Sequence, residues 1–141
     1  MRLSTKGRYA TRIMVCLAMR HGGAPVQKVE IAESEGLTKD YVEQILMKLR
    51  TAGLVESHRG VRGGFTIARD PKEITVDDVL RASEGDMVLA PCGVDDCARS
   101  SACPTRELWR EAEATLTTFF AKHTIADLVL KTKKKARSKK K

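Results

Sequence analysis

Three consecutive residues, Gly36, Leu37 and Thr38, constrain the fold of this chain most, because they separate two helical patterns. Upstream, a short apolar pattern predicts a helix that the glycine ends. Thr38 is a good N-cap for a second helix. The apolar residues of that helix recur at three- and four-residue spacing: Val42, Ile45, Leu46 and Leu49. The two helices are therefore joined by a tight turn.

The segments around this turn predict a small helical domain with a β-hairpin. A further amphipathic helix is predicted over about 6–21, with the apolar face Ala10, Ile13, Met14, Leu17 and Ala18. Residues 54–57 alternate as a strand does, the glycine-rich stretch 58–64 can turn the chain, and 65–67 return as a second strand. Helix, short helix, glycine turn, helix and basic hairpin is the order of a winged helix-turn-helix domain, predicted here over 1–69.

Charge is distributed unevenly along the chain. Residues 1–69 contain 12 Lys or Arg and 6 Asp or Glu, and residues 70–130 contain the reverse, 6 basic and 12 acidic. The tail 131–141 has 8 basic residues and no acidic residue. The basic first part indicates a polyanion partner, and the acidic part argues against a protein that coats nucleic acid over its whole surface. The tail lacks an apolar face, so we expect it to be disordered, either contacting phosphates or remaining solvated.

The helix that follows the tight turn is suited to enter the major groove of DNA with its N-terminal side chains. Glu43 is informative there, because an acid near phosphates is costly but can accept a hydrogen bond from cytosine; a solvated helix charge is the alternative. Two arginines of the hairpin can reach phosphates or the minor groove. The predicted DNA-binding residues are Thr38, Lys39, Tyr41, Glu43, Gln44, Arg59 and Arg62. With only 4% aromatic residues, the chain does not suggest a reader of single strands.

The four cysteines are best interpreted through the compartment. No secretory signal is recognisable, and no apolar run approaches the roughly 20 residues that span a bilayer. A cytoplasmic protein without a membrane partner is therefore expected, and thiols stay reduced there. Cys16 lies within the first predicted helix and is expected to be a small buried hydrophobe.

Cys92, Cys97 and Cys103 share one loop of small residues, which leaves room for an inorganic group between the sulfurs. Zinc sites usually need closer cysteine pairs and a fourth Cys or His, which this loop does not offer. Uncomplexed redox-active thiols are a second possibility. An iron–sulfur cluster tolerates wider spacing and is the preferred interpretation, either 2Fe-2S or 4Fe-4S. Pro104 suits a first helical position, so Cys103 is expected at a helix N-terminus, which favours a thiolate.

Residues 70–130 are predicted to form a linker helix, the cysteine loop and a long dimerisation helix. Thr75 and Asp78 form a capping-box pattern that opens a helix through about Ser83, and Thr124 begins a similar pattern before a short terminal helix. Between them, over about 105–122, apolar residues step by three and four: Trp109, Ala112, Leu116, Phe119 and His123. This narrow stripe is typical of a helix that pairs with a second copy, and a homodimer is expected; packing on its own winged domain is the alternative.

The fold class is therefore mainly α with a small β-wing: a winged helix-turn-helix followed by a long C-terminal dimerisation helix. From the residues alone, the functional interpretation is a homodimeric protein that binds double-stranded DNA and holds an iron–sulfur cluster. A regulator that senses through bare thiols is the alternative, and an electron carrier would use the cluster without DNA. No nucleophile motif or phosphate loop suggests an enzyme.

The chain resembles the Rrf2 family of bacterial winged-helix regulators, which includes iron–sulfur cluster assembly repressors and nitric-oxide-sensing repressors. The resemblance covers about 1–130 and is carried by the segments 3–10, 41–46, 53–55 and 59–65, the cysteine loop with Leu108-Trp109, and 124–128. It implies a dimeric transcriptional regulator, expected to be a repressor, whose cluster state alters its binding to double-stranded operator DNA. Glu43 and Arg59 match family positions that contact DNA, and Cys92, Cys97 and Cys103 match the cluster cysteines.

Two departures from the family concern the fourth cluster ligand. Arg106 stands where the assembly repressor has a histidine ligand, and Arg8 stands where the nitric-oxide sensor uses an aspartate of the partner subunit. The first cysteine interval is also one residue shorter. The fourth ligand, the cluster type and the signal are therefore left open by the resemblance.

Overall fold

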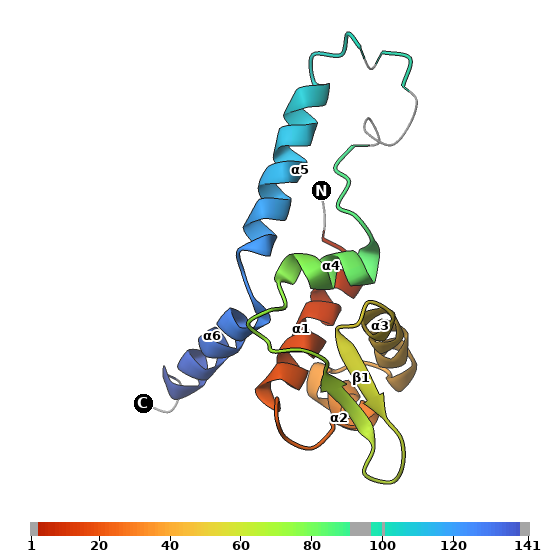
Figure 1. Cartoon of the computed structure of the whole chain (residues 1–141), viewed down its shortest axis with the longest axis vertical. Helices are drawn as coiled ribbons and strands as arrows, with labels where there is room; N and C mark the ends of the chain where they lie inside the picture. Colours follow the sequence, from red (N-terminus) through yellow and green to blue (C-terminus); the bar gives the residue numbers. More distant parts are fainter. Residues whose placement is uncertain (1–2, 91–96, 100, 139–141) are drawn as a thin grey trace.

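The computed structural model describes residues 3–90, 97–99 and 101–138, and shows a mostly helical chain with one two-stranded sheet (Figure 1). This confirms the mainly α fold with a small β-wing. Within the described residues, no helix is both long and apolar enough to cross a membrane. The elements are α1 (Thr5–Met19), α2 (Lys28–Glu35), α3 (Lys39–Thr51), β1 (Val55–His58), β2 (Gly64–Ile67), α4 (Val76–Glu84), α5 (Arg106–Ala121) and α6 (Ile125–Ser138).

Helix α1 lies at the centre of the core. The apolar face predicted from the sequence is buried, and it packs with the inner face of α3 and with residues of α4 and α6. Gly7 lies where α1 crosses α4, and a side chain at this position would overlap the carboxylate of Glu84. The side chains of Glu84 and Leu80 of α4 therefore pack directly over the glycine.

The tight turn between α2 and α3 forms as the sequence predicts. Gly36 adopts a left-handed conformation with φ of 66°, which ends α2, and the amide of Leu37 donates to the carbonyl of Ala32 at 2.9 Å. Thr38 then caps α3, its hydroxyl accepting from the amide of Tyr41 at 3.3 Å. The direction of α3 is therefore set by two adjacent caps.

The wing is an antiparallel hairpin in which Val55 pairs with Ile67 and His58 pairs with Gly64. Both strands begin within one residue of the predicted positions. The backbone groups of Phe65 and Val26 exchange two hydrogen bonds of 2.9 Å, which attach β2 to the segment before α2. Gly64 permits this approach, because a Cβ there would collide with the Val26 carbonyl. The wing is thus fixed to the helix-turn-helix at its base.

Helix α5 begins later than the sequence predicts. The expectation that Pro104 occupies the first helical position is wrong, because α5 begins at Arg106. The amide of Arg106 contacts the carbonyl of Cys103 at 3.4 Å, so the proline lies at the second position of a turn, where its fixed φ is also favoured. No residue of α5 is buried within the described chain, and the helix stands away from the winged body (Figure 1).

The prediction of a disordered tail over 131–141 is wrong for residues 131–138, which continue α6. The helix begins at the predicted capping box, in which Thr124 and Asp127 exchange hydrogen bonds of 2.9 and 3.2 Å. Ile125 and Val129 anchor its first half in the core. Lys, Ala and Arg have high helix propensity, and cations are favoured at a helix C-terminus, so the helix continues without an apolar face.

Candidate DNA interface and cysteine loop

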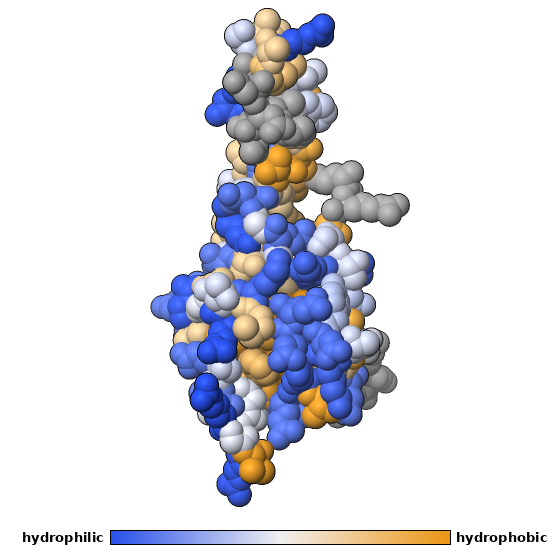
Figure 2. All heavy atoms as spheres, turned by 90° about the vertical axis from the view of Figure 1, so that its right-hand side faces the viewer, coloured by the Kyte–Doolittle hydropathy of each residue, from blue (hydrophilic) through white to orange (hydrophobic). Residues whose placement is uncertain are grey.

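The N-terminal half of α3 presents polar side chains at the surface. Thr38, Lys39, Glu43 and Gln44 are exposed, as the prediction of DNA contacts requires. The face that carries α3 and the wing is mostly hydrophilic (Figure 2). The exposed hydroxyl of Thr38 is already engaged as the helix cap, so its first role in the free protein is structural.

Tyr41 differs from its predicted neighbours because it is half-buried. Its ring meets the ring of Tyr9 edge to face, with centroids 6.2 Å apart, and the Arg12 guanidinium lies 5.4 Å from the centroid of Tyr9. Part of the Tyr41 ring therefore packs α3 against α1.

Glu43 forms an ion pair with Lys28 of α2, with 2.6 Å between Oε2 and Nζ. Both side chains are partly exposed, so the pair is a surface feature of modest energy. It places a cation and a carboxylate at the same point of the candidate DNA interface. The sequence does not predict a role for Lys28, because no spacing pattern links residues on two different helices.

The two arginines of the wing are exposed. Among the residues that the structure describes, neither Arg59 nor Arg62 forms a hydrogen bond or an ion pair. The side-chain amide of Gln27 donates to the carbonyl of Val61 at 3.4 Å and so contacts the tip of the wing. The wing therefore holds two exposed cations, as the prediction of phosphate contacts requires.

The described part of the cysteine loop, residues 97–99 and 101–103, lies near the N-terminal end of α5, remote from the wing (Figure 1). Cys97 is exposed and Cys103 is half-buried, whereas Cys92 lies outside the described residues. Over the described residues, which exclude Cys92, no group of three or more His, Cys, Asp or Glu side chains forms a metal site.

The Cys103 sulfur lies 3.3 Å from the Thr105 hydroxyl. Hydrogen bonding from Thr105, with help from Arg106, lowers the pKa of the Cys103 thiol.

Three hydrogen bonds connect the segment that leads to the cysteine loop to other elements. The carboxylate of Glu113 on α5 accepts from the amides of Leu89 and Ala90 at 2.6 and 3.4 Å, just before the loop. At the other end of the same segment, the ammonium of Lys48 on α3 donates to the carbonyl of Ser83 at 3.0 Å. The chain that leads to the cysteines is thus attached to α5 on one side and to α3 on the other. Sequence patterns gave no sign of either contact.

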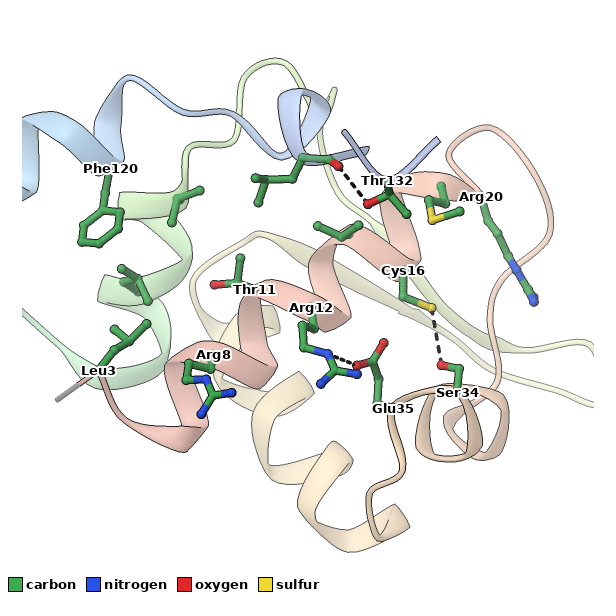
Figure 3. A pocket seen from close by; sticks show the side chains of 15 residues that line it. Leu3, Arg8, Thr11, Arg12, Cys16, Arg20, Ser34, Glu35, Phe120 and Thr132 are labelled. Atoms are coloured by element: carbon green, nitrogen blue, oxygen red, sulfur yellow. Dashed lines mark hydrogen bonds and ion pairs between the residues drawn. The ribbon is translucent and has the colours of Figure 1, made fainter. Parts of the chain in front are cut away.

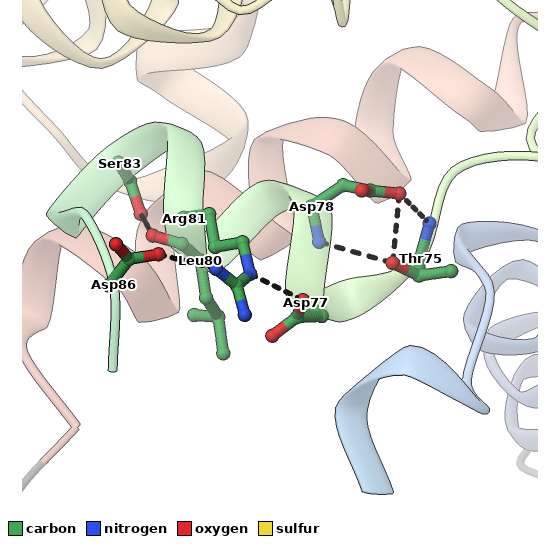
Figure 4. Close-up of polar contacts among 7 residues, drawn as sticks. All are labelled: Thr75, Asp77, Asp78, Leu80, Arg81, Ser83 and Asp86. Carbon is green, nitrogen blue, oxygen red and sulfur yellow. Dashed lines mark hydrogen bonds and ion pairs between the residues drawn. The ribbon is translucent and has the colours of Figure 1, made fainter. Parts of the chain in front are cut away.

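Helix α4 carries the start of this segment, and polar contacts hold both of its ends (Figure 4). Thr75 and Asp78 form the predicted capping box at its N-terminus. Near its C-terminus, Arg81 pairs with Asp77 at 2.7 Å and also contacts Asp86, which follows the helix. The mutual contacts raise the pKa of Arg81, chiefly through its hydrogen bond to Asp77.

Cys16 is not fully buried, which corrects the expectation of a core residue. It faces a cavity of about 810 Å³ between α1, α2 and the C-terminal helices, away from the core side of α1 (Figure 3). Its sulfur lies 4.0 Å from the Ser34 hydroxyl, and partial burial raises the pKa of the thiol. Arg12 pairs with Glu35 at 2.5 Å on the same wall. Cys16 comes from α1 and not from the cysteine loop.

Comparison with known proteins gives one consistent result. Residues 3–131 match the Rrf2 family, described as iron-dependent transcriptional regulators. The HTH-type transcriptional regulator IscR of Vibrio cholerae is 36% identical over 131 residues, which cover 92% of this chain and 76% of that protein.

Two solved structures are similar along most of their length. CymR, the global cysteine regulator of B. subtilis, has a TM-score of 0.79 and 34% identity, covering 92% of this chain and 96% of that chain. IscR of T. potens has a TM-score of 0.77 and 33% identity, covering 94% of this chain and 88% of that chain.

Proposed function

Since the chain belongs to the Rrf2 family of transcriptional regulators, we propose that it acts as a homodimeric, operator-binding repressor whose DNA affinity is modulated by an iron–sulfur cluster. The observation that carries the DNA-binding part is the exposed N-terminal half of α3 beside two available arginines of the wing. In this proposal the side chains of Lys39, Glu43 and Gln44 contact base edges. Arg59 and Arg62 contact phosphates or the minor groove.

The cluster part rests on the donor set of the loop. Cys92, Cys97 and Cys103 would hold the cluster through their thiolates, with the fourth ligand and the choice between 2Fe-2S and 4Fe-4S left open. The lowered pKa of Cys103 fits this role, because only the thiolate binds iron. Bound there, the cluster would supply a redox- and iron-sensitive group. The protein itself contributes the attachment of the loop segment to α5 through Glu113 and to α3 through Lys48.

The dimer is supported by the exposure of large apolar side chains on α5 in the single chain. Trp109 and Phe119 of the predicted stripe are 40% and 52% exposed, which is costly for large apolar side chains in water. The cavity beside α1 has apolar walls, including Val15, Met19 and Leu128, and is open to receive a helix. The proposed occupant is α5 of a second copy, whose acidic half is opposite in charge to the basic winged half.

The experiment that tests the function first selects operator-like duplexes from a random pool, then measures affinity by fluorescence anisotropy. The selected duplex should bind more tightly than a scrambled one, and binding should weaken with salt. Replacing Glu43→Ala should reduce discrimination at one base pair by about tenfold or more, as the loss of a good base contact does. Lys28→Ala, the other half of the ion pair, should weaken both duplexes alike. Equal affinity of the wild-type protein for both duplexes would refute operator recognition.

A cluster-free, thiol-sensing regulator is the second candidate. The specific observation in its favour is that Cys97 is exposed and the pKa of Cys103 is lowered, which are also the features of reactive thiols. Anaerobic purification separates the two candidates. A brown protein with stoichiometric iron and sulfide supports the cluster, and a colourless protein that still binds the operator supports the thiol mechanism.

A further inference from the structure

The second half of α6 is a strongly basic helix. Residues 131–138 are all exposed and include no acidic residue, and the Rrf2 match ends at residue 131. Its cations are Lys131, Lys133, Lys134, Lys135 and Arg137. We name residues 131–138 the basic arm. It lies almost wholly outside the part of the chain that the family shares, so family membership does not explain its charge.

The basic arm is attached to the winged half of the molecule. The amides of Ile125 and Ala126, at the start of α6, donate to the carbonyls of Ile74 and Pro71 at 2.8 and 3.1 Å. Both acceptors lie shortly after β2, the second strand of the wing. Ile125 and Val129 are buried against the core. The arm therefore extends from the body that carries α3 and the wing, and not from α5.

The positive charge of the basic arm favours a polyanion as its binding partner. Lys131 and Lys135, and likewise Lys133 and Arg137, are four residues apart on the helix, where like charges repel and destabilise it. A row of phosphates would remove this repulsion and release counterions. A membrane surface is a poor partner, because the arm offers only Ala136 as an apolar side chain and has no apolar face to insert.

We propose that the basic arm is a second DNA-contacting element, which binds backbone phosphates of the duplex that flanks the operator. The inference rests on the proposed function, operator binding by the winged half. Once that half is bound, the attached arm is held at high local concentration near the same duplex. The eight residues of the arm extend about 12 Å as a helix. In Figure 1, α6 leaves the body on the opposite side of α1 from α3. The phosphates that the basic arm would contact therefore belong to DNA outside the base pairs that α3 would contact.

The test compares two full-length variants. In the first, the five cations of the arm are replaced by Gln, which keeps helix propensity and removes charge. In the second, Lys131, Lys133, Lys134 and Lys135 are replaced by Arg, which keeps both. Affinity for the selected operator is measured over a range of salt concentrations, on a duplex limited to the operator and on one with about 20 extra base pairs on each side. Circular dichroism verifies that both variants remain folded.

The glutamine variant should lose about tenfold or more in affinity for the long duplex, with a salt slope smaller by about 0.9 for each phosphate released. The loss should be smaller on the short duplex, and the arginine variant should bind like the wild-type protein. Unchanged affinity and salt slope in the glutamine variant would overturn the proposal. So would an equal loss in the arginine variant, or an effect confined to single-stranded RNA. A glutamine variant that still prefers operator over scrambled duplex shows that operator recognition stands whether or not the arm contributes.

Discussion

At the scale of single residues, the pKa values of two cysteines, Cys16 and Cys103, are shifted in opposite directions for different physical reasons. Partial burial beside Ser34 raises the pKa of Cys16, because the charged thiolate loses hydration. The pKa of Cys103 is lowered chiefly by hydrogen bonding from Thr105, which stabilises the thiolate. The Cys103 thiol therefore forms a thiolate, the form that binds iron or acts as a nucleophile, at a lower pH than the Cys16 thiol does.

We predict that alkylation of the cluster-free protein follows these pKa directions. In a variant with Cys103 as its only cysteine, the reaction with iodoacetamide should begin at a lower pH than in a variant that retains only Cys16. Thr105→Val should move the Cys103 profile to higher pH, because it removes the hydroxyl that stabilises the thiolate. The measurement is the alkylation rate against pH by mass spectrometry. Superimposable profiles for Cys103 with and without the Thr105 hydroxyl would contradict this assignment.

At the scale of elements, local capping chemistry explains why most of the fold was predictable. Gly36, Thr38 and the two capping boxes are short-range signals, and each sets a helix end within one or two residues of its prediction. The prediction of a helix start at Pro104 was wrong because proline is favoured both in a turn and at a helix start. The prediction of a disordered tail was wrong for residues 131–138 because charge composition alone does not indicate that a helix has already been nucleated and anchored upstream.

We expect the capping box of α4 to have a measurable share in stability. The Thr75 hydroxyl accepts from the amide of Asp78 at 3.1 Å and donates to its carboxylate at 2.8 Å. Thr75→Val keeps the shape and removes both bonds, so the free energy of unfolding in urea should fall by about 1 kcal/mol. Thr132→Val is the matched control, because that exposed hydroxyl only bonds back to the carbonyl of Leu128 within α6. A loss no larger than that of the control would count against the cap.

The candidate site was predictable only in part. The exposed residues at the start of α3 and the wing arginines follow from local pattern, and their exposure agrees with the prediction of DNA contacts. The pair of Lys28 with Glu43, and the bond from Lys48 to Ser83, join residues that are 15 and 35 positions apart. Such contacts depend on how helices pack, and no periodicity in one segment encodes them.

At the scale of the whole molecule, the predicted apolar stripe of α5, in which Trp109 and Phe119 are exposed, leads to a prediction about assembly. Leu116→Asp together with Phe119→Asp should convert a dimer to monomers, because two carboxylates cannot be buried in an apolar helix contact. Ala114→Asp with Thr118→Asp, at exposed positions of the same helix outside the predicted stripe, is the charge-matched control. Sedimentation velocity at micromolar concentration reports the state. A wild-type protein that sediments as a monomer would rule out the proposed dimer.

Within the described residues, the Lys48 ammonium gives α3 a side-chain hydrogen bond to the end of α4, from which the chain continues toward the cysteine loop. The segment before the cysteines is held to α5 by Glu113, and the end of α4 is held to α3 by the Lys48 ammonium. If assembly of a cluster moves this segment, the displacement reaches α3 at the Ser83 carbonyl. Since half-sites of a dimeric reader are spaced about one helical turn apart, a small tilt of α3 changes the fit to DNA.

We therefore predict that Lys48→Met reduces the coupling between cluster and operator. In the wild-type protein, dissociation constants measured anaerobically with and without the cluster should differ by about 5- to 150-fold, the usual range of allosteric coupling, in either direction. Lys48→Met keeps the apolar stem and removes the donor, so the ratio should move toward one while the visible absorption of the cluster is unchanged. Arg50→Met, an exposed cation on the same helix, controls for the lost charge. If Lys48→Met retains the wild-type ratio, the influence of the cluster reaches α3 by another route.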